Sequence, residues 1–252
     1  MNNKIIIISI VALIVGLVGG YAGSSIPSNA PQLKGETGEE SVSITPDASD
    51  FLSLRPEISS LPTQDISDGE RDGLILMREE EKLAHDVYTA LYEIWGHKVF
   101  SNIAQSEQTH IEAIRTLLIK YGILDPVTDE SVGAFTNQDL AGLYTTLVAQ
   151  GQTSLKDALN VGALIEDLDI ADLERLAAET DNEDITLVYS NLTRGSRNHI
   201  RSFISQIEMQ GGVYTPQYIT EQEFNDIISS PREIGAQGGG GMNGSRRGTG
   251  GR

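Results

Sequence analysis

The chain has 252 residues, with 36 acidic and 18 basic side chains and a formal net charge of −18. This charge argues against a nucleic-acid-binding protein, which needs a basic surface. The chain contains no cysteine, which excludes disulfides, thiolate catalysis and cysteine-ligated zinc or iron–sulfur sites. Its length and its hydrophobic content of 39% suffice for one domain of ordinary size with additional tails.

The first 23 residues have the pattern of a targeting segment. After Lys4, an apolar run extends from Ile5 to Ala22, close to the lower limit of length for a membrane-spanning helix. The length of the run favours a single-pass N-terminal anchor in the cell membrane. A cleaved signal peptide, with cleavage near Ala22 or Ser24, is the alternative and predicts a secreted protein. In both cases we expect the remaining chain to lie outside the cytoplasm.

The segments on either side of the main helical region have the composition of unstructured chain. Residues 24–66 are rich in serine, proline, glycine and acidic side chains, and we expect a flexible stalk. Residues 233–252 are glycine-rich and are expected to form a disordered tail. The folded domain is therefore predicted to cover residues 67–232.

Apolar spacing and end signals predict four long helices and two short ones. In chain order the predicted helices cover residues 68–95, 98 or 101–121, 137–150, 154–178, 182–210 and 221–229. Short connections near residues 97 and 181 make each pair of long helices an antiparallel hairpin, and the longer crossover 122–153 joins the hairpins. No stretch alternates as a strand does, so the predicted fold class is all-α.

Each long helix places a metal-binding side chain in the apolar seam that should face the core. The six candidate metal ligands are Glu81, Glu107, His110, Glu166, Asp169 and His199. A buried carboxylate without a partner is costly, so it normally needs a cation, a proton or a metal. At a rise of ~1.5 Å per residue, the six positions lie at similar heights in their hairpins. This pattern predicts a metal site, although a metal-free acid–imidazole network remains an alternative, and Asp169 also fits a solvated edge.

Two of these segments resemble a known superfamily. Glu81-Lys-Leu-Ala-His-Asp-Val-Tyr88 and Glu107-Gln-Thr-His110 resemble the ligand segments of ferritin-like proteins such as rubrerythrins. The stretches GALIEDLDIADL and GSRNHIRSF resemble more closely the domain-of-unknown-function 2202 family, and the resemblance covers about residues 68–232. It implies a ferritin-like four-helix bundle that holds a di-iron or di-manganese centre through two glutamates and two Glu-x-x-His motifs.

The last helix departs from this pattern. It carries Ser196-Arg-Asn-His199, so serine stands where the superfamily has a glutamate. Asp169, one turn from Glu166, is a candidate replacement. The ligand types suit iron or manganese, with zinc possible. Either one or two ions are compatible with the altered motif.

The resemblance implies a metal-dependent oxidoreductase acting on O₂ or peroxide. Two alternatives stay open, namely a non-catalytic metal-binding or metal-stabilised module and a metal-free helical interaction domain. The expected partners are metal ions and, through the N-terminal segment, the membrane. A homodimer is possible, and nucleic acid is not expected.

Overall fold

The computed structural model describes residues 54–234, and all regular secondary structure in this part of the chain is helical. This confirms the predicted all-α class. The four long helices are α3 (Asp68–Trp95), α4 (Lys98–Lys120), α6 (Leu155–Glu179) and α7 (Glu183–Met209), and the shorter ones are α5 (Gln138–Gly151) and α8 (Glu221–Ser229).

The predicted anchor or signal peptide at residues 1–23 lies outside the described residues. Among the residues that are described, no helix combines the length and the apolar character needed to cross a membrane.

Local sequence signals explain where α3 ends and α4 begins. Ser67 and Glu70 form a capping box at the start of α3, in which each side chain accepts a hydrogen bond from the other residue's backbone N–H. Gly96 ends α3 with a left-handed φ of 61°, which glycine adopts without steric cost. His97 then caps α4, because its Nδ1 accepts from the Val99 N–H. The connection is only two residues long, so α3 and α4 run antiparallel.

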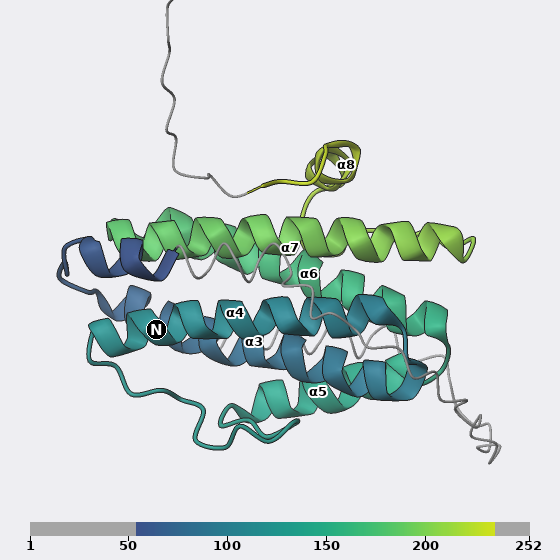
Figure 1. Cartoon of the computed structure of the whole chain (residues 1–252), viewed down its shortest axis with the longest axis horizontal. Helices are drawn as coiled ribbons and strands as arrows, with labels where there is room; N and C mark the ends of the chain where they lie inside the picture. Colours follow the sequence, from purple (N-terminus) through teal and green to yellow (C-terminus); the bar gives the residue numbers. More distant parts are fainter. Residues whose placement is uncertain (1–53, 235–252) are drawn as a thin grey trace, which may run out of the picture.

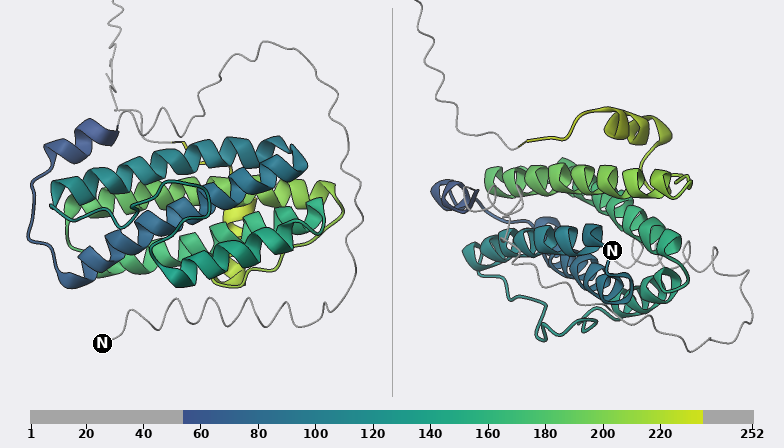
Figure 2. Two further views of the ribbon diagram at one scale, coloured as in Figure 1. Left: turned by 90° about the horizontal axis from the view of Figure 1, so that it is seen from below. Right: turned by 45° about the vertical axis from the view of Figure 1, so that its right-hand side comes forward.

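The long helices form two hairpins that pack on each other. The hairpin of α3 and α4 and the hairpin of α6 and α7 lie in two layers, with α5 beside α3 and α8 on the outer side of α7 (Figure 1). The views in Figure 2 show the same pairing of helices. Contacts between α3 and α6 and between α4 and α7 close the interior.

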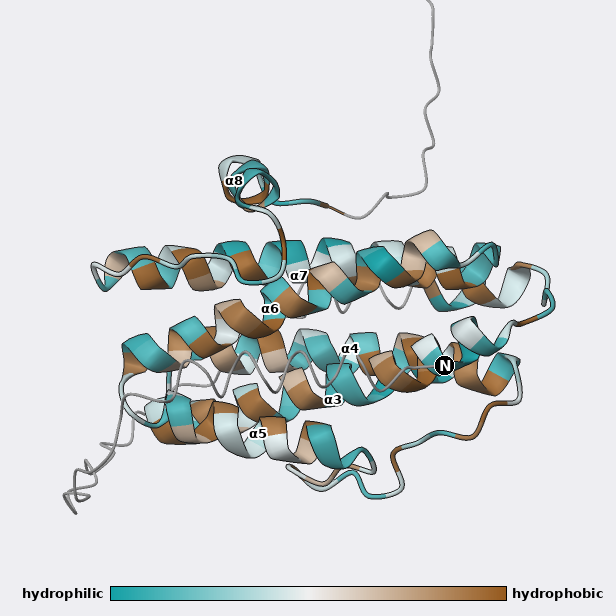
Figure 3. Ribbon diagram, turned by 180° about the vertical axis from the view of Figure 1, so that it is seen from behind, coloured by the Kyte–Doolittle hydropathy of each residue, from teal (hydrophilic) through white to brown (hydrophobic). Residues whose placement is uncertain are grey.

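Hydrophobic and hydrophilic residues alternate along the long helices, as expected for helices that bury one face (Figure 3). The buried apolar residues form two clusters. One includes Val87, Phe100 and Phe203, and the other includes Leu74, Ile114 and Leu192. On α3, α4 and α7, the candidate ligands lie between the positions that feed these two clusters, so apolar packing insulates the site at both ends.

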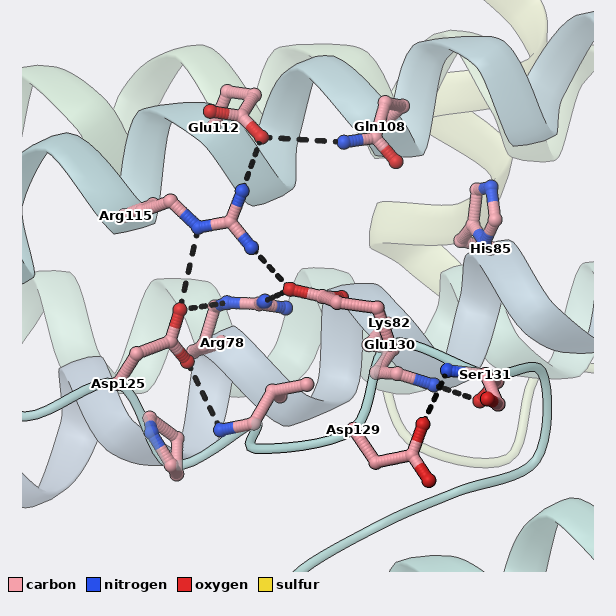
Figure 4. A network of polar contacts seen from close by, with 12 residues as sticks. Arg78, Lys82, His85, Gln108, Glu112, Arg115, Asp125, Asp129, Glu130 and Ser131 are labelled. Carbon is pink, nitrogen blue, oxygen red and sulfur yellow. Dashed lines mark hydrogen bonds and ion pairs between the residues drawn. The ribbon is translucent and has the colours of Figure 1, made fainter.

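Buried arginine on α3 holds the crossover that follows α4. The Arg78 side chain is fully buried; its Nε donates to Asp125 Oδ2 (3.1 Å) and its Nη2 donates to Glu130 Oε1 (2.8 Å). Arg115 of α4 binds the same two carboxylates (Figure 4). The part of the crossover before α5 is therefore fixed to both helices of the first hairpin.

Three further charged residues of α3 extend this attachment. The buried Lys82 ammonium pairs with Asp86 and donates to the Ser131 carbonyl oxygen (2.9 Å). Glu79 Oε1 accepts from the backbone N–H groups of Thr136 (2.8 Å) and Asn137 (3.0 Å), at the N-terminus of α5. A carboxylate at this end of a helix is favourable because the helix dipole is positive there. The outer face of α3 thus sets the position of α5.

The folded unit extends beyond both predicted boundaries. Residues 54–60, predicted as part of the stalk, are helical, and Ile58 is fully buried. Lys120 Nζ donates to the Ile58 carbonyl oxygen at 2.9 Å. At the other end Glu233, predicted as part of the tail, binds Arg197 (Nη2–Oε2 2.6 Å). Side-chain contacts from the long helices order these flanks, which composition alone could not indicate.

Replacing Lys82 with methionine is expected to lower the free energy of unfolding by about 3–5 kcal/mol, because Asp86 is left buried without its ammonium partner. Urea denaturation of the full-length chain measures this change. The control is Glu179→Gln, which removes the partly exposed pair with Arg175 and should change the free energy by less than about 1 kcal/mol. Equal losses in the two variants would show that the buried pair does not hold the crossover.

Candidate metal centre

Five of the six predicted ligands meet in the interior between the two hairpins. They form two groups: Glu81, Glu107 and His110, and Glu107, Glu166 and His199. Within each group the candidate ligand atoms all lie within 4.8 Å of one another. All five side chains are buried. Glu107 belongs to both groups, so the groups are adjacent.

Each of the two carboxylate oxygens of Glu107 lies close to a different histidine. Its Oε2 lies 2.8 Å from His110 Nδ1, and its Oε1 lies 2.9 Å from His199 Nδ1. The two imidazole rings stack with their centroids 5.5 Å apart. One carboxylate of α4 therefore connects its own helix with α7 of the other hairpin.

An outer carboxylate completes each group. Glu81 Oε2 lies 3.2 Å from His110 Nδ1, and Glu166 Oε2 lies 3.4 Å from His199 Nδ1. No residue in the described part of the chain donates a hydrogen bond to Glu81 Oε1, although this atom is buried. Buried oxygens without a donor are costly unless a cation or proton meets them. Three carboxylates and two imidazoles therefore fit iron, manganese or zinc by ligand type.

Neighbouring side chains orient the ligands. Tyr88 donates its hydroxyl hydrogen to Glu166 Oε1 (2.5 Å), and Ser106 Oγ lies 2.9 Å from His199 Nε2. Contacts of this kind hold the Nδ1 face of an imidazole, or one oxygen of a carboxylate, toward the ion. Sequence reasoning did not identify Ser106; its place directly before Glu107 was the available signal.

Gly195 is a second residue that sequence reasoning did not identify. A Cβ atom at this position would lie 2.5 Å from His110 Nε2 and 2.7 Å from His110 Cε1. Glycine within a helix is destabilising by about 0.5–1 kcal/mol relative to alanine, so its place inside α7 was a usable signal. Here it makes room for the His110 ring.

Asp169 belongs to neither group. Ser196 donates its hydroxyl hydrogen to Asp169 Oδ2, and Ser196 itself is fully buried. Burial and the charges of Glu81 and Glu166 raise the pKa of Asp169 well above its ordinary value. Asp169 thus lies beside the centre, while its role as the replacement ligand stays a prediction.

The protonation of the centre follows from burial and from its own charges. Burial raises the pKa of Glu81 and of Glu166 to about 7. Burial also acts to raise the pKa of Glu107, but the charges of His199 and His110 outweigh it and lower that pKa. For His110, burial acts to lower the pKa, but Glu81 and Glu107 outweigh it and raise the pKa well above the ordinary value. Without metal, protons bound by Glu81, Glu166 and His110 therefore offset the buried negative charge, while Glu107 stays ionised.

The metal-free protein is expected to lose stability as the pH rises from about 5 to 8. The folded-state pKa values of Glu81, Glu166 and His110 lie above the ordinary values of the unfolded chain. The folded chain therefore binds more protons in this range, so its free energy of unfolding falls as the pH rises. Glu107, whose pKa is lowered, is ionised in both states and adds no slope.

Urea midpoints of the metal-stripped protein at several pH values measure this loss. Saturating Mn²⁺ is the control, because metal replaces protons on the same ligands and should remove the loss. A midpoint that rises with pH in the metal-free protein would contradict the assignment.

The substitution Gly195→Ala is expected to displace the His110 ring and to reduce metal content while the chain stays helical. Gly142→Ala is the matched control: it is also within a helix, and a Cβ there meets no described atom within 4 Å. Elemental analysis and circular dichroism measure the two effects. Full metal content in the Gly195 variant would show that the ring position does not matter for binding.

Comparison with known proteins confirms the resemblance to the domain-of-unknown-function 2202 family. The family model described as "Uncharacterized protein domain (DUF2202)" matches residues 70–231, a range that contains all six predicted ligands. The chain is 57% identical over 178 residues to the uncharacterized protein MJ0754 of Methanocaldococcus jannaschii, covering 71% of this chain and 96% of the relative. The crystal structure of hypothetical protein MJ0754 from Methanococcus jannaschii matches with a TM-score of 0.68 and 56% identity, covering 69% of this chain and 99% of that one. The chain therefore belongs to the DUF2202 family.

Proposed function

We propose that this chain is a ferritin-like metal-binding protein with a dinuclear centre, and that it acts as an iron- or manganese-dependent oxidoreductase on O₂ or peroxide. The observation that carries the proposal is the position of Glu107, which presents one carboxylate oxygen to each of two histidine Nδ1 atoms. Glu107 with Glu81 and His110 would hold one ion, and Glu107 with Glu166 and His199 would hold a second.

The ligand count supports a catalytic centre over a structural one. Each group contains three residues, and Glu107 is shared between them. Structural zinc sites usually have four protein ligands, whereas catalytic metal sites keep at least one position open for water or substrate. Iron or manganese bound here would supply the electrons that reduce O₂ or peroxide.

The arrangement of helices supports the ferritin-like assignment. The ferritin-like pattern takes ligands from each of four long helices. The candidate ligands here are likewise distributed over the four long helices: Glu81 on α3, Glu107 and His110 on α4, Glu166 on α6 and His199 on α7. Ser196 replaces the second Glu-x-x-His glutamate, and its hydroxyl binds Asp169. One side of the centre therefore has a hydroxyl and a half-buried carboxylate in place of a second bridging carboxylate.

The protein contributes orientation and proton placement. Tyr88 holds Glu166, and Ser106 contacts the far nitrogen of His199. In the metal-free protein, burial raises the pKa of Glu81 and of Glu166 to about 7, so metal binding near neutral pH would displace protons from these carboxyl groups. Burial of all five ligands excludes bulk water.

We further propose that this chain is anchored in the cell membrane. The apolar run at residues 5–22 favours a membrane anchor, with the helical domain outside the cytoplasm. Expression of the full-length chain followed by protease treatment of intact cells distinguishes this placement from a cytoplasmic one.

The full-length chain, purified in detergent with iron or manganese supplied, is expected to hold about two ions per chain. Glu107→Gln should lose both ions because it removes the shared carboxylate, and Glu166→Gln should lose about one. The matched control is Glu112→Gln on the outer face of α4, whose carboxylate is 40% exposed. Elemental analysis measures all four proteins, and a wild-type chain without stoichiometric metal would refute the proposal.

Redox activity is a separate measurement. Addition of ferrous iron and air to the metal-free protein should produce a visible absorption band. With an added electron donor, which supplies the two electrons that reduce each peroxide to two waters, peroxide should be consumed catalytically. Stable, redox-silent zinc with no turnover would favour a non-catalytic metal-binding module.

A further inference from the structure

A groove of about 540 Å³ lies between the start of α4 and the second half of α7. Residues of α4 from Lys98 to Ile103 line one side, residues of α7 from Asn198 to Gln206 line the other, and Arg232 also contributes. Ile103 and Asn198 are each only 5% exposed and form the base of the groove. Its volume lies in the range of small-molecule sites, which is about 300–1,000 Å³.

The lining of this groove is basic, although the chain as a whole is strongly acidic. Lys98, Arg201 and Arg232 line it, and none of its lining residues in the described chain is acidic. Along α7, residues 185–207 contain no aspartate or glutamate, whereas 36 of the 252 residues of the chain are acidic. Two other grooves on the described surface differ, because one is lined by Asp72, Glu79 and Glu179 and the other by Glu174, Glu223, Asp226 and Glu233. A concave basic lining concentrates anions.

Hydrogen bonds hold the α7 side of the groove in place. Arg201 Nε donates to the Ile227 carbonyl oxygen (2.8 Å), and its Nη1 donates to Asn198 Oδ1 (3.0 Å). Glu233 pairs with Arg201 (Nη2–Oε1 2.9 Å) and also with Arg197 (Nη2–Oε2 2.6 Å). One carboxylate therefore offsets two guanidinium groups, and this pair of arginines keeps a net positive charge. The position of Arg201 is set before any ligand binds, which lowers the entropic cost of binding.

The groove lies next to the candidate metal centre. Asn198 directly precedes His199, and Ile103 lies one helical turn before Ser106 and Glu107. Ser106 Oγ of α4 lies 2.9 Å from His199 Nε2 of α7, so the two helices that form the groove also meet at the centre. Along α4, about one turn, or roughly 5.4 Å, separates the base of the groove from the ligands.

The proposed activity needs an external source of electrons. Reduction of one hydrogen peroxide to two waters takes up two electrons and two protons. The chain contains no cysteine and therefore no cysteine-ligated iron–sulfur cluster that could store these electrons. Burial of the ligands also prevents a donor from touching the centre directly. A donor must therefore bind on the surface close to the centre.

We propose that the groove between α4 and α7 binds a small anionic electron donor. The inference rests on the proposed function, since it names the class of molecule that supplies the centre with electrons. Two molecules of a one-electron donor are oxidised for each peroxide that is reduced, and the two protons come from solvent. Lys98 and Arg232 attract the anion, while Val99 and Ile103 offer apolar contact to its carbon skeleton.

Anion binding to the metal-free, full-length protein in neutral detergent tests the site without turnover. Hexacyanocobaltate(III), a redox-inert trianion, should bind to the wild type in isothermal titration calorimetry. Lys98→Gln and Arg232→Gln should each weaken this binding about five-fold or more, because each removes one positive charge close to the anion. The matched control is Arg71→Gln, which removes the same charge from an exposed position near the start of α3, at the far end of the hairpin from Lys98. Absence of binding, or equal weakening in all three variants, would overturn the inference.

Peroxide reduction by the metal-loaded protein separates the role of the groove from the activity itself. Two viologens with the same ring system serve as donors: a sulfonated one, which is negatively charged when reduced, and methyl viologen, which is then positively charged. In the Lys98 and Arg232 variants, kcat/KM should fall about five-fold for the sulfonated donor only, and added salt should reduce this difference. An equal effect on both donors would contradict the inference, while turnover by the wild type would leave the proposed function standing. No turnover with either donor, despite intact anion binding, would refute the proposed activity and with it the donor role of the groove.

Discussion

The contact of Glu107 with two histidines is the constraint on which the rest of the site depends. Glu107 and His110 come from the first hairpin, and His199 comes from the second. A buried carboxylate with its pKa held low must keep positive partners, either imidazolium or metal, on both sides. This requirement favours the packing of the two hairpins that brings both imidazoles to one carboxylate.

Helix α3 links this centre to the rest of the fold through its two polar faces. Its inner face carries Glu81, and its outer face carries Arg78, Glu79 and Lys82, which hold the crossover. The segment before α5 leads into that helix, whose Leu143 and Leu147 line a small apolar cavity together with Leu83 of α3. Charges on one side of α3 thus bind the loop before α5, while the other side of the helix carries Glu81 of the candidate metal centre.

Much of this arrangement follows from helix periodicity. Spacing along each helix identified the seam positions of Glu81, Glu107, His110, Glu166 and His199, and the structure brings these five together. Asp169 lies on the same face of α6 as Glu166, but its carboxylate accepts a hydrogen bond from Ser196 of the neighbouring α7. The packing of that helix therefore decides which partner Asp169 has. Ser106 on α4 contacts His199 on α7, and Gly195 on α7 makes room for His110 on α4. These contacts join different helices, so they can be recognised only once the helices are packed.

The sequence alone determined, to within a few residues, where α3 to α8 begin and end and which face of each long helix turns inward, because capping residues and apolar spacing are local properties. The tertiary structure decided that Glu107 is the shared carboxylate, that Arg78 and Lys82 are buried beneath the crossover, and that Glu80 lines a cavity. These outcomes depend on the relative rotation of helices and on an aperiodic loop. Neither leaves a repeating pattern in the order of residues.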